Sequence, residues 1–485
     1  MSQENTVRSS GEALSTVPST PKNQRNKDYG YLDEQGQIYL DYTGAGLASR
    51  SQLDAHHSRL TNYTSGNPHS INPTSQIAND LVAKTRTRVL EFLNACPREY
   101  AVIFTANATG AARLVGEAYA FGRHSRFVLT ADNHNSINGL RRYAERAKAR
   151  TDYISIQTDG DMRTSSADVK AALRPRRMGC LFKDSCRSLF AYPAQSNFTG
   201  VTHPLCWVKL AQDRGYDVLL DAAAYLPTSD IDLSQIKPEF VIVSWYKLFG
   251  FPTGVGSLVV RRDALATLNR PWFSGGTVQA ALVGVKWHML NDDETAFEDG
   301  TLNFLSIPDV HFGIDWLLQL GREATAARVR WLTERFIRSL HALRHTNGKP
   351  MAVIYGPTDM KSRGGTIAFN LLDAEGNIID GDIVARDSAA ARISIRTGCF
   401  CNPGAGETAL KIPQKQVQAF FNRRRAAAGD GTHRGPLASA IRASFGVASI
   451  EEDGDALMQL IESVYRDWVP ISRRSDVNNG PKEGL

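Results

Sequence analysis

Cysteine is scarce in this sequence, with 6 residues among 485. That density is far below that of domains held together by disulfide bonds, which are typical of oxidising compartments. The sequence also lacks the apolar opening segment of a secretory signal peptide, because Met1 to Asp28 is polar. Both features predict a protein of a reducing, cytoplasmic compartment.

Long hydrophobic runs and an excess of one charge are missing as well. No apolar stretch reaches the ~18 residues that suggest a membrane span. The chain has 56 Lys and Arg against 50 Asp and Glu, a net charge of +6 that is weak evidence for a nucleic-acid partner over this length. With 42% hydrophobic residues, the composition is that of an ordinary soluble globular protein. We therefore expect neither nucleic acid nor a membrane as a partner.

The cysteines fall into two groups. Two of them form the short sequence Cys399-Phe400-Cys401, which has no second Cys or His pair at zinc-ligand spacing, so no metal site is predicted. The other four stand alone and are interpreted as structural thiols. They are Cys96, Cys180, Cys186 and Cys206.

The two ends of the chain differ in composition from its middle. Residues 1–27 and 472–485 are polar and poor in aromatic residues, which predicts disordered tails. Between them, apolar runs alternate with segments of helical periodicity, and this alternation predicts an α/β fold with a mainly parallel sheet. The clearest strands are residues 101–106, 126–131, 217–223, 240–245 and 255–260. The clearest helices are residues 77–93, 106–121 and 138–149.

Lys247 follows directly after the apolar strand at residues 240–245. Open α/β sheets build their sites at the carboxyl ends of strands. An amine that is partly removed from water there has a lowered pKa, which suits it to Schiff-base chemistry. Taken alone, Lys247 would more readily be interpreted as a surface lysine.

Asp221 changes that interpretation, because it ends the preceding apolar strand in DVLLDAA. A lysine and a carboxylate at the ends of neighbouring strands are what pyridoxal 5′-phosphate requires. The lysine forms an imine with the cofactor, and the carboxylate keeps the pyridine nitrogen protonated. The pair therefore predicts a pyridoxal phosphate site.

Small residues open the helix that follows strand 101–106, in NATG (107–110). Free backbone N–H groups and the Thr109 hydroxyl could bind a phosphate there, and Ser244 could add a second hydroxyl. His134 follows a third strand and could stack on the cofactor ring. An ordinary loop histidine is the alternative.

Nine segments in the same order resemble the class V aminotransferase-fold enzymes, and in particular the cysteine desulfurase-like domain of molybdenum cofactor sulfurases. The resemblance runs from about Tyr31 to Val469. The segments are LDYTGAG (40–46), GNPHS (66–70), DNHNSINGLR (132–141), FAYPAQSNFTG (190–200), DAAAYLPTSDIDLS (221–234), SWYKLFGFPTGVG (244–256), FEDGT (297–301), RTGCFCNPGAG (396–406) and IRASFG (441–446).

This resemblance implies the fold-type-I architecture of pyridoxal phosphate enzymes, arranged as a homodimer. A large cofactor-binding domain with a mainly parallel seven-stranded sheet would span residues 51–305. A smaller α/β C-terminal domain would combine residues 28–50 with 306–471.

The resemblance also implies a role for each matching residue. Lys247 would bind the cofactor covalently, Asp221 would face its pyridine nitrogen, and His134 would stack on its ring. Asn197 would lie near its phenolic oxygen, and Arg442 would bind the substrate α-carboxylate through a bidentate guanidinium. The phosphate-binding positions are Ala108, Thr109 and Ser244, with Thr277 reaching the phosphate held by a partner subunit.

Cys401 matches the sulfur acceptor of a desulfurase, which takes sulfur from L-cysteine as a persulfide and leaves alanine. That attack needs a deprotonated thiol on a mobile loop, and residues 396–406 supply glycines together with Arg396, which could lower the thiol pKa. Cys399 is the alternative nucleophile. A sulfur-acceptor protein or metabolite would complete the transfer.

Four residues depart from the family pattern. Ala224 stands where ordinary cysteine desulfurases carry a Gln, and Tyr42 and Thr43 stand where the sulfurases commonly have His-Ala. Gly406 stands where the sulfurases commonly have a third Cys. Since the N-terminal segment borders the substrate in this fold, Tyr42 and Thr43 indicate a changed substrate. The sulfurases also continue into a second domain, which this sequence does not show, so delivery of sulfur to molybdenum is not assumed.

Two functional hypotheses follow. The first is removal of sulfur from L-cysteine or a cysteine conjugate, with a persulfide on Cys401. The second is a C–S lyase, or another elimination or transamination enzyme of specialised metabolism, acting on a modified amino acid without a protein persulfide. A catalytically silent scaffold fits poorly, because Lys247, Asp221, His134 and Arg442 are all present.

Overall fold

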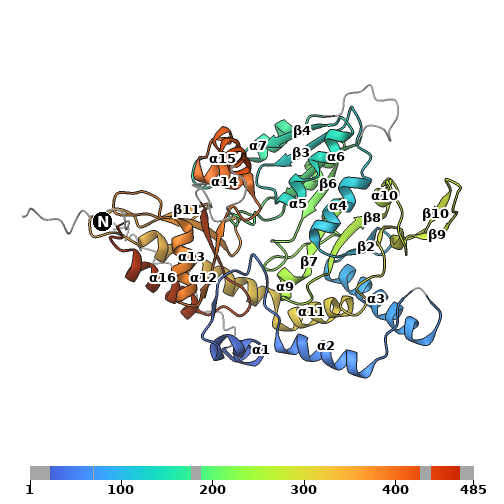
Figure 1. Cartoon of the computed structure of the whole chain (residues 1–485), viewed down its shortest axis with the longest axis horizontal. Helices are drawn as coiled ribbons and strands as arrows, with labels where there is room; N and C mark the ends of the chain where they lie inside the picture. Colours follow the sequence, from blue (N-terminus) through green and yellow to red (C-terminus); the bar gives the residue numbers. More distant parts are fainter. Residues whose placement is uncertain (1–21, 69, 176–186, 427–438, 470–485) are drawn as a thin grey trace, which may run out of the picture.

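The computed structural model of the chain describes four stretches, which are residues 22–68, 70–175, 187–426 and 439–469. Most of the predicted N-terminal tail and the predicted C-terminal tail lie outside these stretches, as do Cys180 and Cys186. A sheet enclosed by helices forms one part of the molecule, and a smaller sheet with its own helices lies beside it (Figure 1). No helix of the described stretches is both long and apolar enough to cross a membrane.

The larger sheet has seven strands in the order β2-β8-β7-β6-β5-β3-β4. Strand β8 pairs antiparallel with both of its neighbours, and the remaining pairs are parallel. The mainly parallel seven-stranded sheet is therefore confirmed. Its strands are β2 (Tyr100–Thr105), β3 (Arg126–Thr130), β4 (Arg150–Ile154), β5 (Ser188–Pro193), β6 (Tyr216–Asp221), β7 (Phe240–Ser244) and β8 (Gly256–Arg261).

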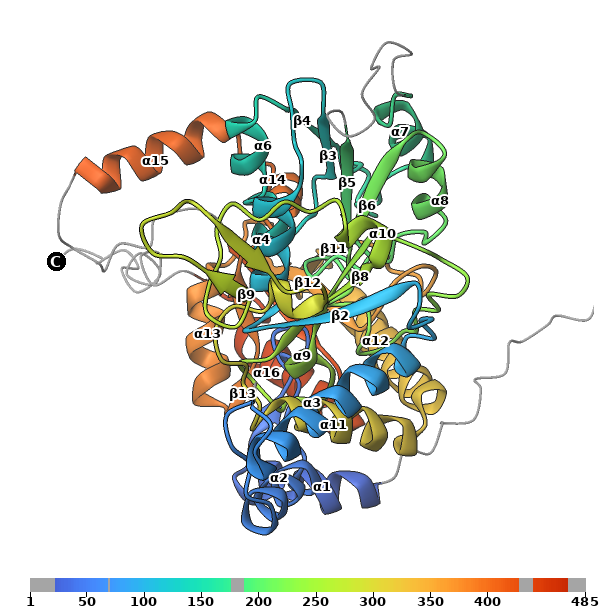
Figure 2. The same ribbon diagram turned by 90° about the vertical axis from the view of Figure 1, so that its right-hand side faces the viewer.

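Helices cover both faces of this sheet, which explains why its strands are continuous apolar runs. Alternate residues of one strand belong to different cores: Val241 packs with α3 (Pro73–Phe92) and α11 (Ile307–Leu320), whereas Ile242 packs with α4 (Ala108–Ala118). Figure 2 shows α4 on one side of the sheet and α3 with α11 on the other. Three shorter helices extend these layers. They are α6 (Arg141–Arg146), α7 (Ser166–Ala172) and α8 (Trp207–Gln212).

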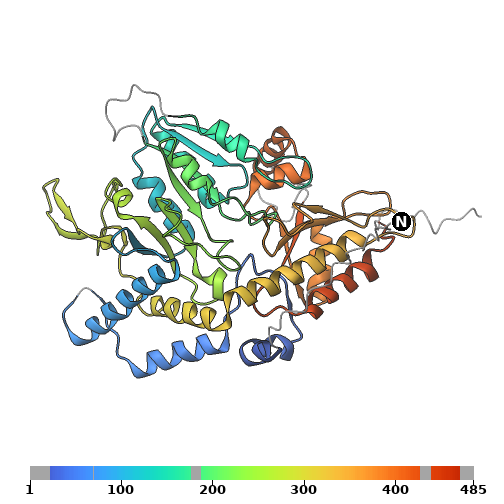
Figure 3. The same cartoon turned by 180° about the vertical axis from the view of Figure 1, so that it is seen from behind.

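The smaller sheet is antiparallel, with the strand order β11-β12-β15-β14. Its apolar face packs against helices α12, α13 and α16 in a separate core. Figure 3 shows α12, in gold, running beside α16, in red. These elements are β11 (Ala352–Tyr355), β12 (Thr366–Leu371), β14 (Arg396–Gly398), β15 (Ala440–Ser444), α12 (Arg322–Ala342), α13 (Gly381–Ala390) and α16 (Glu451–Tyr465).

The division into two domains stays a prediction, but two contacts bear on its boundaries. Strand β1 (Ile38–Tyr39) pairs with β13 (Ile393–Ser394), so the N-terminal segment lies with the C-terminal part of the chain. Helix α11, which the resemblance places in the smaller domain, packs with α3 in the core of the large sheet. A boundary near Gly321, between α11 and α12, would follow this packing better than one at residue 305.

The expected disorder of residues 22–27 is wrong, because helix α1 (Lys22–Glu34) begins at Lys22. Arg25 is 6% exposed and forms ion pairs with Asp453 (2.9 Å) and Asp33 (2.8 Å). Polar residues stabilise this helix through partners far away in the sequence, and composition alone does not reveal such partners.

Candidate functional site

A pocket at the carboxyl edge of the large sheet contains most of the predicted site residues. It is lined by the ends of β6 and β7, by the start of α4, and by α5 (Asn135–Asn138) and α9 (Trp245–Phe249). Parallel strands end at the same edge of a sheet, so side chains that follow different strands meet there. The predicted residues among its lining are Ala108, Thr109, His134, Asn197, Asp221, Ser244 and Lys247.

Lys247 lies on the short helix α9, directly after β7. Burial lowers the pKa of its amine, the positive charges of Arg442 and Arg396 lower it further, and Asp221 opposes the shift. Asp221 ends β6, which pairs in parallel with β7, and its Oδ1 accepts a hydrogen bond from the Ala223 N–H at 3.0 Å. The Lys247 amine, whose pKa is lowered, therefore lines the same pocket as the Asp221 side chain.

The start of α4 forms another part of the pocket wall and offers hydrogen-bond donors. Helix α4 begins there, with Asn107 as N-cap accepting a hydrogen bond from the Gly110 N–H at 2.9 Å. The Thr109 hydroxyl bonds that of Ser136 at 2.7 Å. Ser244 is 1% exposed, and its Oγ has no hydrogen-bond partner among the described residues. A buried hydroxyl beside a helix N-terminus is satisfied when a phosphate binds.

His134 caps helix α5 rather than lying in an irregular loop. Its Nδ1 accepts a hydrogen bond from the Ser136 N–H at 3.1 Å, so the neutral ring carries its proton on Nε2. Burial lowers its pKa, Asp221 raises it, and Lys247 and Arg442 lower it. Ser136, which sequence reasoning missed, therefore contacts both His134 and Thr109.

The donor set fits pyridoxal phosphate. Lys247 offers the amine, Asp221 offers the carboxylate for a ring nitrogen, and the α4 N-terminus with the unpartnered Ser244 hydroxyl offers the phosphate site. The described residues bring together no group of three His, Cys, Asp or Glu side chains that could hold a metal ion.

Arg442, which is predicted to bind the substrate carboxylate, already contacts other groups of the chain. It is 2% exposed on β15, and its Nη2 pairs with Asp41 at 2.8 Å while its Nη1 donates to the Asn197 carbonyl at 3.0 Å. The Phe400 ring lies over the guanidinium, 4.7 Å from ring centroid to carbon. Only Nε is without a hydrogen-bond partner among the described residues. The guanidinium therefore makes hydrogen bonds within the chain through two of its three nitrogens.

Arg396 is also committed to Asp41, which it contacts through Nη2 at 2.6 Å and Nε at 2.8 Å. The sequence suggested that Arg396 lowers the pKa of a nearby thiol, whereas the structure pairs it with this carboxylate. Asp41 thus joins two arginines, one buried and one half-exposed. Sequence reasoning missed Asp41, although it stands beside Tyr42 in the LDYTGAG segment.

The loop of Cys399 and Cys401 is fastened to the pocket through Asn197. The Asn197 Nδ2 donates to the Phe400 carbonyl at 2.7 Å, and its Oδ1 accepts from Asn402 at 3.0 Å. Asn197 therefore holds this loop, in addition to lining the pocket. Cys401 is exposed but does not line the lysine pocket. Desolvation raises the pKa of the Cys399 thiol, and the nearby carboxylate of Glu407 raises it further.

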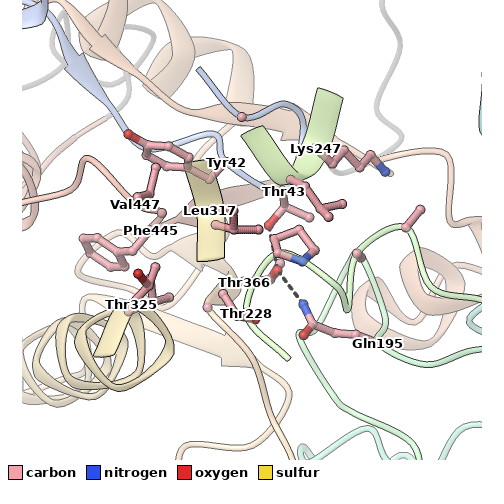
Figure 4. A pocket seen from close by; sticks show the side chains of 18 residues that line it. Tyr42, Thr43, Gln195, Thr228, Lys247, Leu317, Thr325, Thr366, Phe445 and Val447 are labelled. Carbon is pink, nitrogen blue, oxygen red and sulfur yellow. Dashed lines mark hydrogen bonds between the residues drawn. The ribbon is translucent and has the colours of Figure 1, made fainter. Parts of the chain in front are cut away.

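Tyr42 and Thr43 line a second pocket, which also reaches Lys247 (Figure 4). Its walls are mostly apolar, and they include Leu317, Val329 and Phe445. Ala224 and Gln195 line both pockets.

Thr277 lies in neither pocket. It is fully buried, and its hydroxyl donates to the Ser274 carbonyl at 2.7 Å and accepts from the Ser274 N–H at 2.9 Å. Within one chain it therefore closes a turn, and its contact with a partner's phosphate stays a prediction.

Comparisons with known proteins give consistent results. A family model described as aminotransferase class-V matches residues 38–457. The molybdenum cofactor sulfurase of Arabidopsis thaliana is 34% identical over 482 residues, which cover 92% of this chain and 59% of the relative. The human molybdenum cofactor sulfurase is 34% identical over 469 residues, which cover 92% and 51%. The chain thus spans between half and three fifths of the length of these relatives.

Two solved structures share the fold. A cysteine desulfurase from Thermococcus onnurineus NA1 aligns with a TM-score of 0.76 and 22% identity, covering 92% of this chain and 98% of the other. A C-DES mutant with glycine covalently linked to its PLP cofactor aligns with a TM-score of 0.69 and 17% identity, covering 91% and 99%. At these identities the likeness shows the fold alone.

We expect Asp41→Asn to lower the free energy of unfolding by about 3 kcal/mol, because it leaves the buried Arg442 guanidinium without its anionic partner. Urea denaturation measures the change. The control is Asp455→Asn, which breaks an exposed pair with Arg335 and should cost less than about 1 kcal/mol. Equal, small losses for both variants would show that the Asp41 pair is not important for stability.

Proposed function

This chain belongs to the aminotransferase class-V family, and we propose that it is a pyridoxal phosphate enzyme that removes sulfur from L-cysteine or a cysteine conjugate. The carrying observation is that Lys247, Asp221 and the N-terminus of α4 line one pocket, to which Asn197 fastens the loop of Cys401. Relatives and neighbours described as sulfurases and desulfurases support the same chemistry.

Three sets of residues hold the proposed cofactor. Lys247 would bond it, Asp221 would serve its ring nitrogen, and the start of α4 with Thr109 and Ser244 would hold its phosphate. When bound, pyridoxal phosphate withdraws electrons from the α-carbon of an attached amino acid, so that bonds near that carbon break more easily. Lys247 then serves a second purpose. Its lowered pKa leaves Nζ free to take the proton from the substrate α-carbon and to return it later.

Cys401 is the proposed sulfur acceptor because desolvation and the Glu407 carboxylate raise the pKa of the Cys399 thiol and disfavour its thiolate, while both residues are exposed. The Cys401 thiolate attacks the substrate sulfur and forms an S–S bond. The C–S bond breaks, and its electron pair stays with the substrate carbon. That carbon takes up a proton, so alanine is released and the sulfur remains on Cys401 as a persulfide for a later acceptor.

A C–S lyase is the second candidate, and one observation favours it. Cys401 lines neither of the two pockets that meet at Lys247. The second pocket, with Tyr42, Thr43 and Ala224 in its walls, offers apolar space next to the lysine. An elimination that needs no protein thiol would release the sulfur-containing group and leave pyruvate or another keto acid.

We also propose that the functional unit is a homodimer. Strands β9 (Val278–Ala281) and β10 (His288–Leu290) form a hairpin that projects from the large sheet (Figure 1). In and near this hairpin lie five large apolar side chains that are between 45% and 103% exposed. They are Leu282, Val283, Val285, Trp287 and Met289. An exposed apolar patch of this kind marks an interaction site, and a second copy of the chain is the proposed occupant.

Reconstitution with pyridoxal phosphate and reduction with borohydride should fix a phosphopyridoxyl group on Lys247, which peptide mass spectrometry detects. Lys247→Ala should lose this label and lower turnover at least ~100-fold, because both the attachment point and the base are removed. Lys209→Ala, which changes an exposed lysine, is the control. A reconstituted wild-type protein without label on Lys247 would refute the cofactor proposal.

After incubation with L-cysteine, the Cys401 peptide should carry one additional sulfur atom. Cys401→Ser should lose this mass and reduce alanine formation at least ~100-fold, whereas Cys399→Ser should change it by no more than roughly threefold. Amino-acid analysis measures alanine. If Cys401→Ser still releases sulfide at the wild-type rate and pyruvate accumulates, the lyase is the correct assignment.

Val283→Asp combined with Trp287→Glu should weaken self-association at least ~100-fold, because charge enters an apolar contact. Sedimentation equilibrium measures the dissociation constant. Val464→Asp, at an exposed apolar position of α16 in the other part of the molecule, is the matched control. A wild-type protein that is monomeric at micromolar concentration contradicts the proposal.

A further inference from the structure

Cys399 and Cys401 belong to one tight turn. The Asn402 N–H donates to the Cys399 carbonyl at 2.8 Å, and the two central residues of the turn have positive φ. Phe400, which lies between the cysteines, is buried, and its ring packs against Phe198 with 5.1 Å between ring centroids. Both cysteines are exposed. The two thiols therefore flank a side chain that points into the protein, and both are open to solvent.

The backbone of this turn suits a bond between the two thiols. Residues two apart in a chain have Cα atoms at most about 7 Å apart, and a turn brings them closer. Disulfide bonds join residues whose Cα atoms lie about 4.4–6.8 Å apart. Gly398, just before Cys399, has a φ of 119°, and apart from its chain neighbours no described atom lies within 4 Å of its Cβ position. The chain there has room to adjust. The charge of Cys401 raises the pKa of the Cys399 thiol, so the two groups are close enough to interact.

Gly406 decides which partner Cys399 has. It lies on helix α14 (Pro403–Leu410), and a Cβ atom at this position would be 3.3 Å from the Cys399 Sγ and 3.5 Å from the Cys399 Cβ. The Cβ atoms of a disulfide lie about 3.5–4.5 Å apart, so a cysteine at position 406 would be placed to pair with Cys399. With glycine there, Cys399 is a free thiol, and so is Cys401. Cys399 is therefore available to react with its neighbour in the turn.

We propose that Cys399 is a resolving thiol, whose thiolate attacks the Sγ atom of the Cys401 persulfide and releases the outer sulfur as hydrosulfide. The new S–S bond joins Cys399 to Cys401. The S–S bond of the persulfide breaks, and its electron pair leaves with the outer sulfur, which takes up a proton. In this step the Cys399 thiol is oxidised and the outer sulfur is reduced. An external dithiol then reduces the disulfide and restores both thiols. The proposal rests on the proposed persulfide of Cys401.

The surroundings of the two thiols put the steps in order. Desolvation and the Glu407 carboxylate raise the pKa of the Cys399 thiol, so little thiolate forms there at neutral pH. Cys399 therefore competes poorly for the substrate sulfur, and its attack on the finished persulfide is slow. The persulfide of Cys401 accumulates first and the disulfide follows. An external thiol also clears the persulfide, so the mass of the peptide, and not alanine formation, reports on Cys399.

A single turnover tests the proposal. Reconstituted protein receives an equimolar amount of L-cysteine with no other thiol, and samples are alkylated at intervals for peptide mass spectrometry. The peptide that contains both cysteines should first gain one sulfur atom, and later lose it and lack two hydrogen atoms, as hydrosulfide appears in equal amount. Cys399→Ser should keep the added sulfur and release hydrosulfide at least ~10-fold more slowly, because no second thiol is present to attack.

Substitution of Gly406 gives a second, independent test. Gly406→Cys should pair with Cys399 when the protein is kept without reductant, and so leave the Cys401 persulfide as stable as Cys399→Ser does. Gly406→Ala is the matched control, since it adds the same Cβ atom without a thiol, and it should form the disulfide of the turn as the wild type does. Circular dichroism checks that each variant is folded.

A measurement without cofactor separates the two levels of the proposal. Oxidised glutathione should form a mixed disulfide on Cys401, which Cys399 resolves by the same attack, so the peptide again lacks two hydrogen atoms. If this disulfide forms but L-cysteine adds no sulfur, the persulfide is refuted, and the role of Cys399 in the reaction with it. If L-cysteine gives a lasting Cys401 persulfide and neither reagent gives the disulfide, the role of Cys399 is refuted while the desulfurase stands. Added sulfur on Cys399 itself would also overturn the proposal.

Discussion

The buried ion pair between Asp41 and Arg442 is the contact on which the geometry of the site depends. Asp41 comes from the N-terminal segment, and Arg442 lies on the smaller sheet. The same guanidinium donates to the Asn197 carbonyl, in a segment that follows the large sheet, and lies against the Phe400 ring. Four stretches of chain that are far apart in sequence therefore meet around one positive charge. Because a buried charge is costly without partners, each of these contacts is favoured by the presence of the others.

The loop of Cys399 and Cys401 is held in an unusual backbone conformation by its hydrogen bonds to the same region. Phe400 and Cys401 both have positive φ, 52° and 55°, a conformation that non-glycine residues adopt only when their surroundings hold them. The surroundings here are hydrogen bonds from Asn197 to the Phe400 carbonyl and from the Asn135 N–H to the Cys401 carbonyl, each 2.7 Å. Asn135 begins helix α5, which His134 caps, so the thiol-bearing loop and the histidine share one support.

The sequence predicted those features that depend on local pattern. Continuous apolar runs identified the strands of the large sheet, and the meeting of Asp221 with Lys247 followed because parallel strands end at one edge. The ordered helix at Lys22, the pairing of Arg396 with Asp41 and the two bonds that restrict Arg442 could not be predicted in this way. Each depends on a partner far away in the chain, and neither composition nor periodicity indicates which partner a charged side chain will find.

The charges around Lys247 also connect substrate binding with proton transfer. Without a ligand, burial and the two arginines keep the pKa of the lysine low, and Asp221 and Asp41 only partly compensate. The α-carboxylate of an amino acid that bound near Arg442 would add a negative charge and reduce the effect of the arginines. The pKa of the lysine would then rise. By linkage, Lys247 gains affinity for a proton when the carboxylate is in place, and the carboxylate binds more tightly once Lys247 is protonated. In the proposed reaction this coupling makes the lysine a stronger base at the stage at which the α-carbon must lose its proton.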